Sequence, residues 1–242
     1  MKTLTMRAFA TFLFATVLMA APLRVQAQSA TGTVVTMSGF FSKGVDNEPT
    51  EAAYALYDSK GKKIGQTLRS SAKEGYLVTG LKPGETYIIR AEDPRFFRQE
   101  WTIDIPATSK YLEISRDFQL YVLEVGRKVK VLPSPFDAKK TTLKPGTEDA
   151  LAKTARLFVM NPNANLELIC YPDAEGSADA AQKFSSARAE AVKAFLVSKG
   201  VSADRISIRA VSTVDPLDPP PIRATAKGKR YVGPVYLVIT KV

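Results

Sequence analysis

The chain has 242 residues, a net charge of +10, one cysteine and no histidine. Without histidine, Ser-His-Asp and Cys-His catalytic arrangements and the usual His-based zinc sites are excluded, and no carboxylate pair stands out as that of a glycosidase. We therefore expect no enzymatic activity, no metal and no other cofactor. The single Cys170 also excludes an intrachain disulfide, so stability must come from packed cores.

Residues 1–27 are typical of an export signal. Lys2 and Arg7 precede an apolar run from Ala8 to Ala21, and Val25-Gln26-Ala27 offers small residues at the cleavage positions. No later run is apolar and long enough to span a membrane, so we expect no transmembrane segment in the mature chain. An exported basic chain suits an anionic polymer or a phospholipid surface and disfavours nucleic acid.

Residues 28–125 predict an all-β antiparallel sandwich, because short β-rich runs alternate with turn signals and no helical stripe appears. Asp58 to Lys62 predicts a hairpin turn, and Pro83-Gly84 predicts a turn directly before a strand. The expected strands are 34–41, 52–57, 76–78, 87–91, 101–105 and 118–123.

The segments Ala53–Gly61, Gly75–Val78 and Gly80–Tyr87 carry a resemblance. They are similar to carboxypeptidase regulatory-like and collagen-adhesin B-type sandwich domains. The resemblance implies a spacer or interaction module without catalytic residues.

Residues 126–242 predict a second, α+β domain in which helices pack on a mixed sheet. Thr147 is expected to cap a helix that ends at Asn161-Pro162, and Gly200 should end a second helix that begins at about Ala178. The expected strands are 128–132, 166–170, 206–211 and 235–240. The second helix should bury an apolar face with Arg188 near its edge; that face comprises Phe184, Ala187, Ala191, Val192 and Phe195.

Asp173 and Arg188 are the candidate binding residues. Asp173 follows a strand, and a helical side chain leans toward the helix N-terminus, so Arg188 can reach the loop that holds Asp173. A carboxylate and a guanidinium that face one cleft suit a ligand with both an ammonium and a carboxylate group. A zwitterionic amino-acid group meets this requirement.

Three motifs add a second resemblance: Phe136 to Pro145, Leu168 to Gly176, and Phe184-Ser-x-x-Arg188-Ala. Their order and spacing resemble the OmpA-like C-terminal domain, which binds peptidoglycan non-covalently. The resemblance implies that Asp173 and Arg188 bind the diaminopimelate branch of the stem peptide. It also implies supporting roles for Tyr171, Ala174, Gly176, Ser185 and Arg230, the last in place of an auxiliary basic residue.

We therefore expect a periplasmic protein peripherally associated with the cell wall or outer membrane. Its C-terminal domain would bind peptidoglycan, and its sandwich would contact another envelope protein. Pro172 stands where the family usually has threonine, and Ala181 where it generally has asparagine. These departures favour the alternative, a degenerate OmpA-like scaffold or assembly module that does not bind peptidoglycan, in which Asp173 and Arg188 form only an exposed ion pair.

Overall fold

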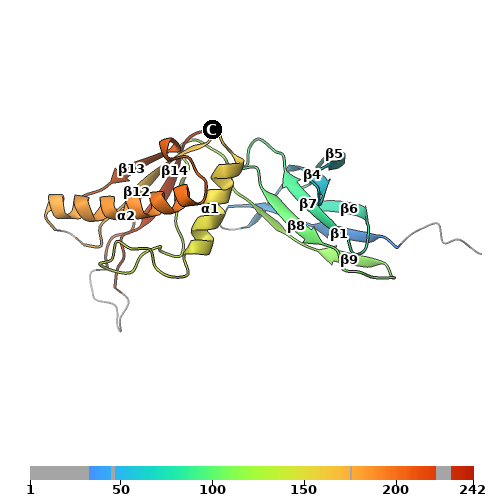
Figure 1. Cartoon of the computed structure of the whole chain (residues 1–242), viewed down its shortest axis with the longest axis horizontal. Helices are drawn as coiled ribbons and strands as arrows, with labels where there is room; N and C mark the ends of the chain where they lie inside the picture. Colours follow the sequence, from blue (N-terminus) through green and yellow to red (C-terminus); the bar gives the residue numbers. More distant parts are fainter. Residues whose placement is uncertain (1–32, 45–46, 175, 222–229) are drawn as a thin grey trace, which may run out of the picture. The chain divides into compact units, whose positions relative to one another are not determined.

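The computed structural model describes residues 33–44, 47–174, 176–221 and 230–242 (Figure 1). The expected export signal lies outside these ranges. No helix in the described ranges has the length and hydrophobicity needed to cross a membrane. Most of the regular structure is β-sheet, with α1 and α2 both in the C-terminal part. We call residues 33–125 the β-rich half and residues 126–242 the α/β half.

The β-rich half forms sheets in the orders β6-β1-β9, β10-β2-β3 and β5-β4-β7-β8. The last sheet is antiparallel, but β1 pairs with β9 and β2 with β10 in parallel. The expectation of a wholly antiparallel fold is therefore wrong for two strand pairs. The strands are β1 (Val35–Gly39), β2 (Phe41–Lys43), β3 (Glu48–Thr50), β4 (Ala53–Asp58), β5 (Lys63–Arg69), β6 (Tyr76–Leu81), β7 (Thr86–Ala91), β8 (Glu100–Asp104), β9 (Leu112–Ser115) and β10 (Phe118–Leu120).

One hydrophobic core holds this half together, and aromatic rings fill much of it. The ring of Phe41 lies 5.3 Å from those of Tyr54 and Tyr76 and 5.6 Å from that of Phe118, measured between centroids. Such pairs add about 0.5–1.5 kcal/mol each to the burial of apolar area. The likeness to carboxypeptidase regulatory-like and collagen-adhesin domains stays a prediction.

The two predicted turns are present. Asp58 accepts hydrogen bonds from the backbone N–H groups of Lys60 and Lys62, and Gly61 takes a positive φ of 79° between β4 and β5. Gly84, with φ of 77°, precedes β7. The prediction missed β5, because all seven of its residues are exposed and no buried face gives it an alternating pattern.

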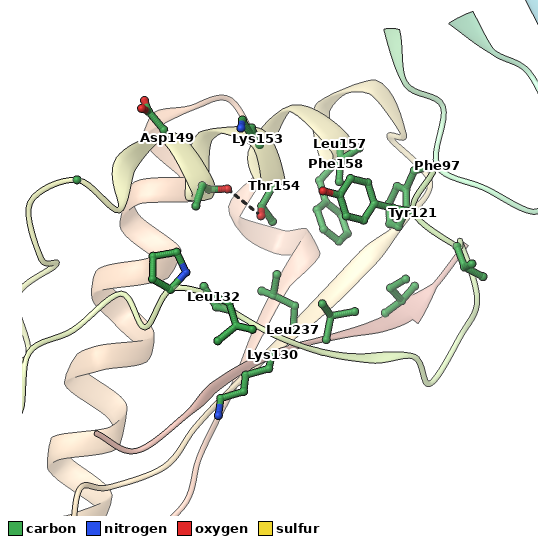
Figure 2. Close-up of a pocket in the computed structure, with 17 residues that line it drawn as sticks. Phe97, Tyr121, Lys130, Leu132, Asp149, Lys153, Thr154, Leu157, Phe158 and Leu237 are labelled. Atoms are coloured by element: carbon green, nitrogen blue, oxygen red, sulfur yellow. Dashed lines mark hydrogen bonds between the residues drawn. The ribbon is translucent and has the colours of Figure 1, made fainter. Parts of the chain in front are cut away.

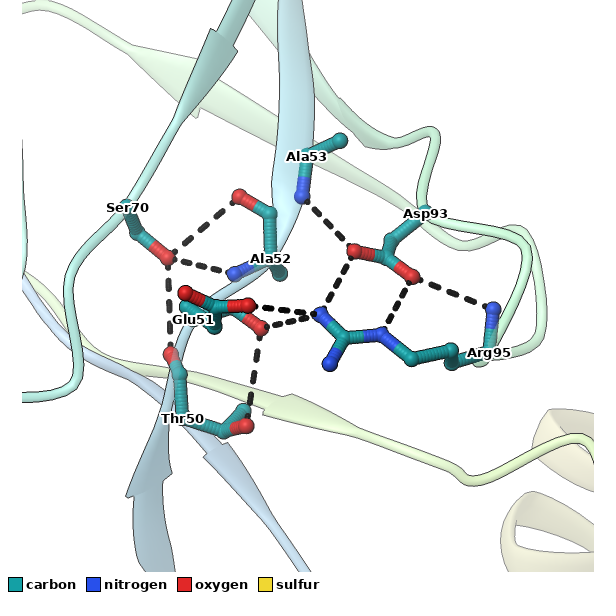
Figure 3. Close-up of polar contacts among 7 residues, drawn as sticks. All are labelled: Thr50, Glu51, Ala52, Ala53, Ser70, Asp93 and Arg95. Carbon is teal, nitrogen blue, oxygen red and sulfur yellow. Dashed lines mark hydrogen bonds and ion pairs between the residues drawn. The ribbon is translucent and has the colours of Figure 1, made fainter.

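A polar cluster fixes the connection into β4 (Figure 3). The Asp93 carboxylate accepts hydrogen bonds from the backbone of Ala53 at 3.2 Å and from the Arg95 guanidinium at 2.9 Å. The Ser70 hydroxyl accepts a hydrogen bond from the backbone N–H of Ala52 at 2.8 Å. The hydrogen bonds from Arg95 hold the pKa of Asp93 down at about 2, against the opposing effect of burial.

The α/β half contains the predicted mixed sheet, whose four strands lie in the order β11-β14-β12-β13. β12 and β13 are parallel, and the other neighbouring pairs are antiparallel. The elements are β11 (Lys128–Lys130), α1 (Glu148–Met160), β12 (Asn165–Cys170), α2 (Ala178–Ser198), the short 3-10 helix η1 (Ala203–Arg205), β13 (Ile206–Ala210) and β14 (Val235–Lys241). Both helices contribute side chains to a second core, between themselves and the sheet.

Two local predictions in this half need correction. Thr147 occupies the position before α1, but its buried hydroxyl donates to the carbonyl of Lys144 and does not cap the helix. The buried face of α2 also differs from the predicted one, because Ala187 is exposed and Arg188 is buried. The residues that α2 buries are Ala181, Ser185, Arg188, Ala189, Val192 and Leu196.

An aromatic residue of the β-rich half packs into the second core. Phe97 comes from the β-rich half but packs in the second core, where its ring lies 5.3 Å from that of Phe158. The backbone of Arg98 exchanges two hydrogen bonds with the side chain of Asn161. The division into independent domains at residue 125 stays a prediction.

Candidate functional site

Asp173 and Arg188 form a bidentate ion pair. Asp173 lies in the loop that follows β12, and Arg188 projects from α2 toward that loop. Arg188 Nη1 donates to Asp173 Oδ1 at 2.5 Å, and Nη2 donates to Oδ2 at 3.0 Å. The predicted reach of Arg188 toward Asp173 is thus confirmed, but the two groups bind each other.

Arg188 also donates two hydrogen bonds to the loop after β11. Its Nε donates to the carbonyl of Lys140 at 2.9 Å, and Nη2 donates to that of Asp137 at 3.0 Å. The guanidinium carbon also lies 4.8 Å from the ring centroid of Phe136 and 4.3 Å from that of Phe184. The side chain is 0% exposed. The expectation that Arg188 lies near the edge of the buried helix face is therefore wrong, and so is that of an exposed ion pair.

Asp173 connects three separate segments. Besides the two hydrogen bonds from the Arg188 guanidinium, its carboxylate accepts one from the backbone N–H of Lys139 at 2.6 Å and another from that of Gly233 at 2.8 Å. Its side chain keeps 12% of its surface exposed. Asp173 is therefore the member of the pair that solvent can reach.

Gly233 is a site residue that the sequence did not reveal. A Cβ at this position would lie closer than 3.0 Å to the carbonyl oxygens of Tyr171 and Pro172. Only glycine lets this backbone come near enough to donate to Asp173 without displacing the loop. The Gly-Pro pair before β14 can be seen in the sequence. The hydrogen bond from Gly233 to Asp173, 60 residues away, cannot.

A cleft of about 530 Å³ borders the loop that Arg188 binds and contains three basic side chains, although Asp173 and Arg188 do not line it. Lys140, Lys144 and Arg230 line it, together with Asp137, Phe136 and Val232. Lys140 Nζ lies 3.3 Å from an Asp137 carboxylate oxygen, and Lys144 Nζ lies 3.9 Å from the other. One carboxylate faces three cations, so this basic cleft keeps an excess of positive charge suited to an anionic ligand.

The predicted supporting residues are divided between different environments. Arg230 lines the basic cleft, whereas Ala174 and Gly176 are exposed in the loop after β12. Ser185 is buried in α2, and its hydroxyl has no hydrogen-bond partner in the described ranges. Tyr171 packs edge-on against Tyr236, with ring centroids 6.0 Å apart. The structure therefore brings only Arg230 into the cleft.

The proline-rich segment after β13 is anchored at its start. Asp215 is buried and accepts hydrogen bonds from the Tyr236 hydroxyl at 2.6 Å and from the backbone of Leu217 at 3.1 Å. Burial, and then the hydrogen bond to Asp215, raise the pKa of Tyr236. Burial and three nearby carboxylates likewise raise the pKa of Tyr231 to about 12.

No metal site is apparent in the part of the chain that the structure describes. Across residues 33–44, 47–174, 176–221 and 230–242, no group of three or more Cys, Asp or Glu side chains could hold an ion.

Comparison with known proteins places the site within a recognisable segment. The model of the OmpA family matches residues 135–228. "Outer membrane protein A" of Serratia odorifera is 39% identical over 82 residues, which are 33% of this chain and 34% of the relative. "Probable lipoprotein YiaD" of Escherichia coli K12 is 32% identical over 94 residues, which are 39% of this chain and 42% of the relative.

Among solved structures, the peptidoglycan-associated lipoprotein of Burkholderia pseudomallei aligns with a TM-score of 0.36 and 19% identity, over 47% of this chain and 89% of that one. The present chain spans between a third and a half of the length of the two curated relatives above. The matched segment begins just before Phe136 and includes both Asp173 and Arg188. Residues 135–228 are thus an OmpA-like domain within this chain.

Proposed function

We propose that this chain is a binding protein of the cell envelope, not an enzyme, and that it binds peptidoglycan non-covalently through the diaminopimelate-containing stem peptide. The observation that carries the proposal is the basic cleft bordering the loop that Arg188 binds, inside the OmpA-like domain. The β-rich half would link the wall to another envelope component.

The roles of the two residues differ in this proposal. Diaminopimelate carries an ammonium and a carboxylate at the end of its side chain. Asp173, with its partly exposed carboxylate, would accept from the ammonium, and the cations of the basic cleft would bind the carboxylate. Arg188 has no exposed surface, so it would act as a positioning residue that holds Asp173 and the loop of Asp137 and Lys140.

The proposed location is the periplasm, in peripheral association with the cell wall or outer membrane. The name of the Serratia relative and the export signal expected at residues 1–27 support it. A wall polymer carrying free carboxylates would also be attracted by the net positive charge of the chain.

A second candidate function is an assembly module that keeps the fold but not the ligand. The observation in its favour is the complete burial of Arg188, whose contacts all serve the fold. Ala181 is also buried on the same helix and offers no polar group to a ligand.

Sedimentation of the purified protein with insoluble peptidoglycan sacculi separates the two candidates. Replacing Lys140, Lys144 and Arg230 together by alanine should weaken sedimentation at least about tenfold, which corresponds to about 1.4 kcal/mol. The matched control replaces three exposed lysines of the β-rich half, Lys60, Lys62 and Lys73, and should leave sedimentation unchanged. Equal losses in both triple variants would show attraction by net charge alone, and no sedimentation of the unsubstituted protein would favour the assembly module.

Competition by soluble peptides tests which part of the wall is recognised. A stem tripeptide ending in meso-diaminopimelate should release the protein from sacculi at lower concentration than the same tripeptide ending in lysine. The two differ by one carboxylate, which is the group that we assign to the basic cleft. Equal potency would contradict that assignment.

A further inference from the structure

A second concave site lies between α1 and β11 and shares Pro133 with the basic cleft (Figure 2). Its volume is about 500 Å³, and we call it the β11 groove. Figure 2 shows α1, with Leu157 and Phe158, on one side and the segment with Lys130 and Leu132 on the other. Phe97 and Tyr121 of the β-rich half close one end.

The groove runs along a sheet edge. β11 is an outer strand of its sheet and pairs there only with β14. Consecutive residues from Val129 to Pro133 line the groove, although their side chains alternate between the two faces of the sheet. It is therefore the edge of the strand that borders the groove.

The hydrogen-bond pattern shows which backbone groups point to that edge. The N–H of Val131 donates to Val235 in β14 at 2.8 Å, and the carbonyl of Arg127 accepts from Ile239 at 3.2 Å. Because alternate residues of a strand direct their N–H and C=O groups to opposite sides, those of Lys128 and Lys130 point away from β14. They form a short row of donors and acceptors along the groove.

The side chains around this row are apolar on one face and basic on the other. Val129, which is 41% exposed, and the buried Val131 line the groove from one face of the chain. Lys128 and Lys130 project from alternate positions of the strand to the opposite face, where Lys128 Nζ lies 3.8 Å from the ring centroid of Tyr236 and Lys130 pairs with Asp218. A strand added to β11 would therefore meet an apolar surface on one face and cations on the other.

We propose that the β11 groove binds an extended peptide segment of a partner protein, in which apolar residues alternate with acidic ones. The segment would extend the sheet as a strand beside β11, with apolar side chains under α1 and acidic ones beside Lys128 and Lys130. This goes beyond peptidoglycan binding and uses a groove that shares only Pro133 with the basic cleft. An alkyl chain is a poorer occupant, since it would remove water from the edge donors and acceptors without replacing their hydrogen bonds.

Lysines on an edge strand can instead serve to prevent pairing with other strands. The test must therefore detect strand addition itself. The probe is a fluorescent octapeptide of alternating valine and glutamate, and its binding to the full chain is followed by anisotropy. Two further peptides carry N-methyl groups on alternate residues, one on the valines and the other on the glutamates. Strand addition predicts that only one of the two N-methylated peptides loses binding by tenfold or more, because only one set of N–H groups faces β11.

Site specificity is tested on α1. Ala150→Trp places a bulky ring in the groove and should weaken binding of the octapeptide at least tenfold. Val159→Trp is the matched control, because Val159 is exposed on the same helix and does not line the groove. A peptide with lysine in place of glutamate should bind more weakly than the acidic one.

The results that would overturn the proposal are equally defined. They are no measurable binding of the octapeptide at millimolar concentration, equal binding of the two N-methylated peptides, and displacement of the probe by palmitate but not by unlabelled octapeptide. Equal effects of the two tryptophan variants would place the peptide elsewhere. None of these outcomes bears on sedimentation with sacculi, so the two proposals fail independently.

Discussion

The two halves of the molecule each contain a bidentate Asp–Arg ion pair, but the buried partner is the acid in one pair and the base in the other. In the β-rich half the acid is buried and the base exposed, with side-chain exposures of 3% for Asp93 and 51% for Arg95. In the α/β half the base is buried at 0% and Asp173 keeps a partly exposed edge. The same pair of residue types therefore anchors a loop in one half and presents a carboxylate in the other.

The buried partner of each pair also determines which backbone groups depend on it. Asp93 accepts hydrogen bonds from the N–H groups of Ala53 and Arg95, whereas Arg188 donates to the carbonyls of Asp137 and Lys140. Loss of a buried partner leaves those groups without a hydrogen bond, and loss of an exposed partner leaves them satisfied. Substitutions at the four positions should therefore differ widely in their effects.

The largest effect is expected for Arg188→Met. It removes a buried charge while leaving Asp173 and two carbonyls with unmet hydrogen bonds, which should lower the free energy of unfolding by about 3–5 kcal/mol. Urea denaturation followed by circular dichroism measures this. Arg209→Met is the matched control, because Arg209 is exposed and pairs with Glu167 on the sheet of the α/β half. This substitution should lower the free energy of unfolding by at most about 1 kcal/mol. Equal costs would show that burial does not distinguish these pairs.

The second largest effect is expected for Asp93→Ala. It should lower the free energy of unfolding by about 1–3 kcal/mol, because the backbone N–H groups of Ala53 and Arg95 lose their acceptor. The chain has one tryptophan, Trp101, whose ring lies 4.7 Å from that of Phe118. Its fluorescence therefore reports on the core of the β-rich half. A denaturation midpoint by tryptophan fluorescence that does not move would contradict the role assigned to Asp93.

Acid should destabilise the β-rich half in a defined pH range. The pKa of Asp93 is lowered to about 2 by Arg95, and that of Glu92 to about 2 because hydrogen bonds from Lys63, Tyr57 and Thr67 outweigh the effect of burial. A lowered pKa gives stability that is present above the unfolded value of about 4 and is lost as the pH falls toward 2. We expect a loss on the order of 1–2 kcal/mol between pH 5 and pH 2, measured by tryptophan fluorescence in urea. Asp93→Asn should reduce this pH dependence.

The smallest effect is expected for Arg95→Ala. The guanidinium is half exposed, and Asp93 keeps its backbone donors without it, so the cost should be about 0–1 kcal/mol. The same denaturation experiment applies. A loss as large as that of Asp93→Ala would mean that the exposed base, and not the buried acid, carries the contact.

The sequence predicted the order of elements in the α/β half well, because its strands and helices have clear periodicity and clear stop signals at Asn161-Pro162 and Gly200. It failed where tertiary contacts decide. Ser185 and Arg188 are polar by type, so a hydrophobic pattern could not place them on the buried face of α2. The parallel pairing of β1 with β9 likewise joins segments about 75 residues apart that carry no local signal.

The same limit applies to the candidate site. Asp173 and Arg188 are recognisable by motif and spacing, but the hydrogen bonds that Asp173 accepts from Lys139 and Gly233 come from distant loops and give no local signal. The lysines of the basic cleft belong to a charged run that resembles any solvated surface. Their proximity to Arg230 exists only in the folded chain.

The single cysteine provides a natural reporter for the α/β half. Cys170 is fully buried at the end of β12, three residues before Asp173, and burial raises the pKa of its thiol to about 12. Only the thiolate reacts readily with alkylating reagents, so the native thiol is protected until this end of the sheet opens. The rate of its alkylation thus measures how often the segment that carries the Asp173–Arg188 pair comes apart under native conditions, without any substitution in the chain.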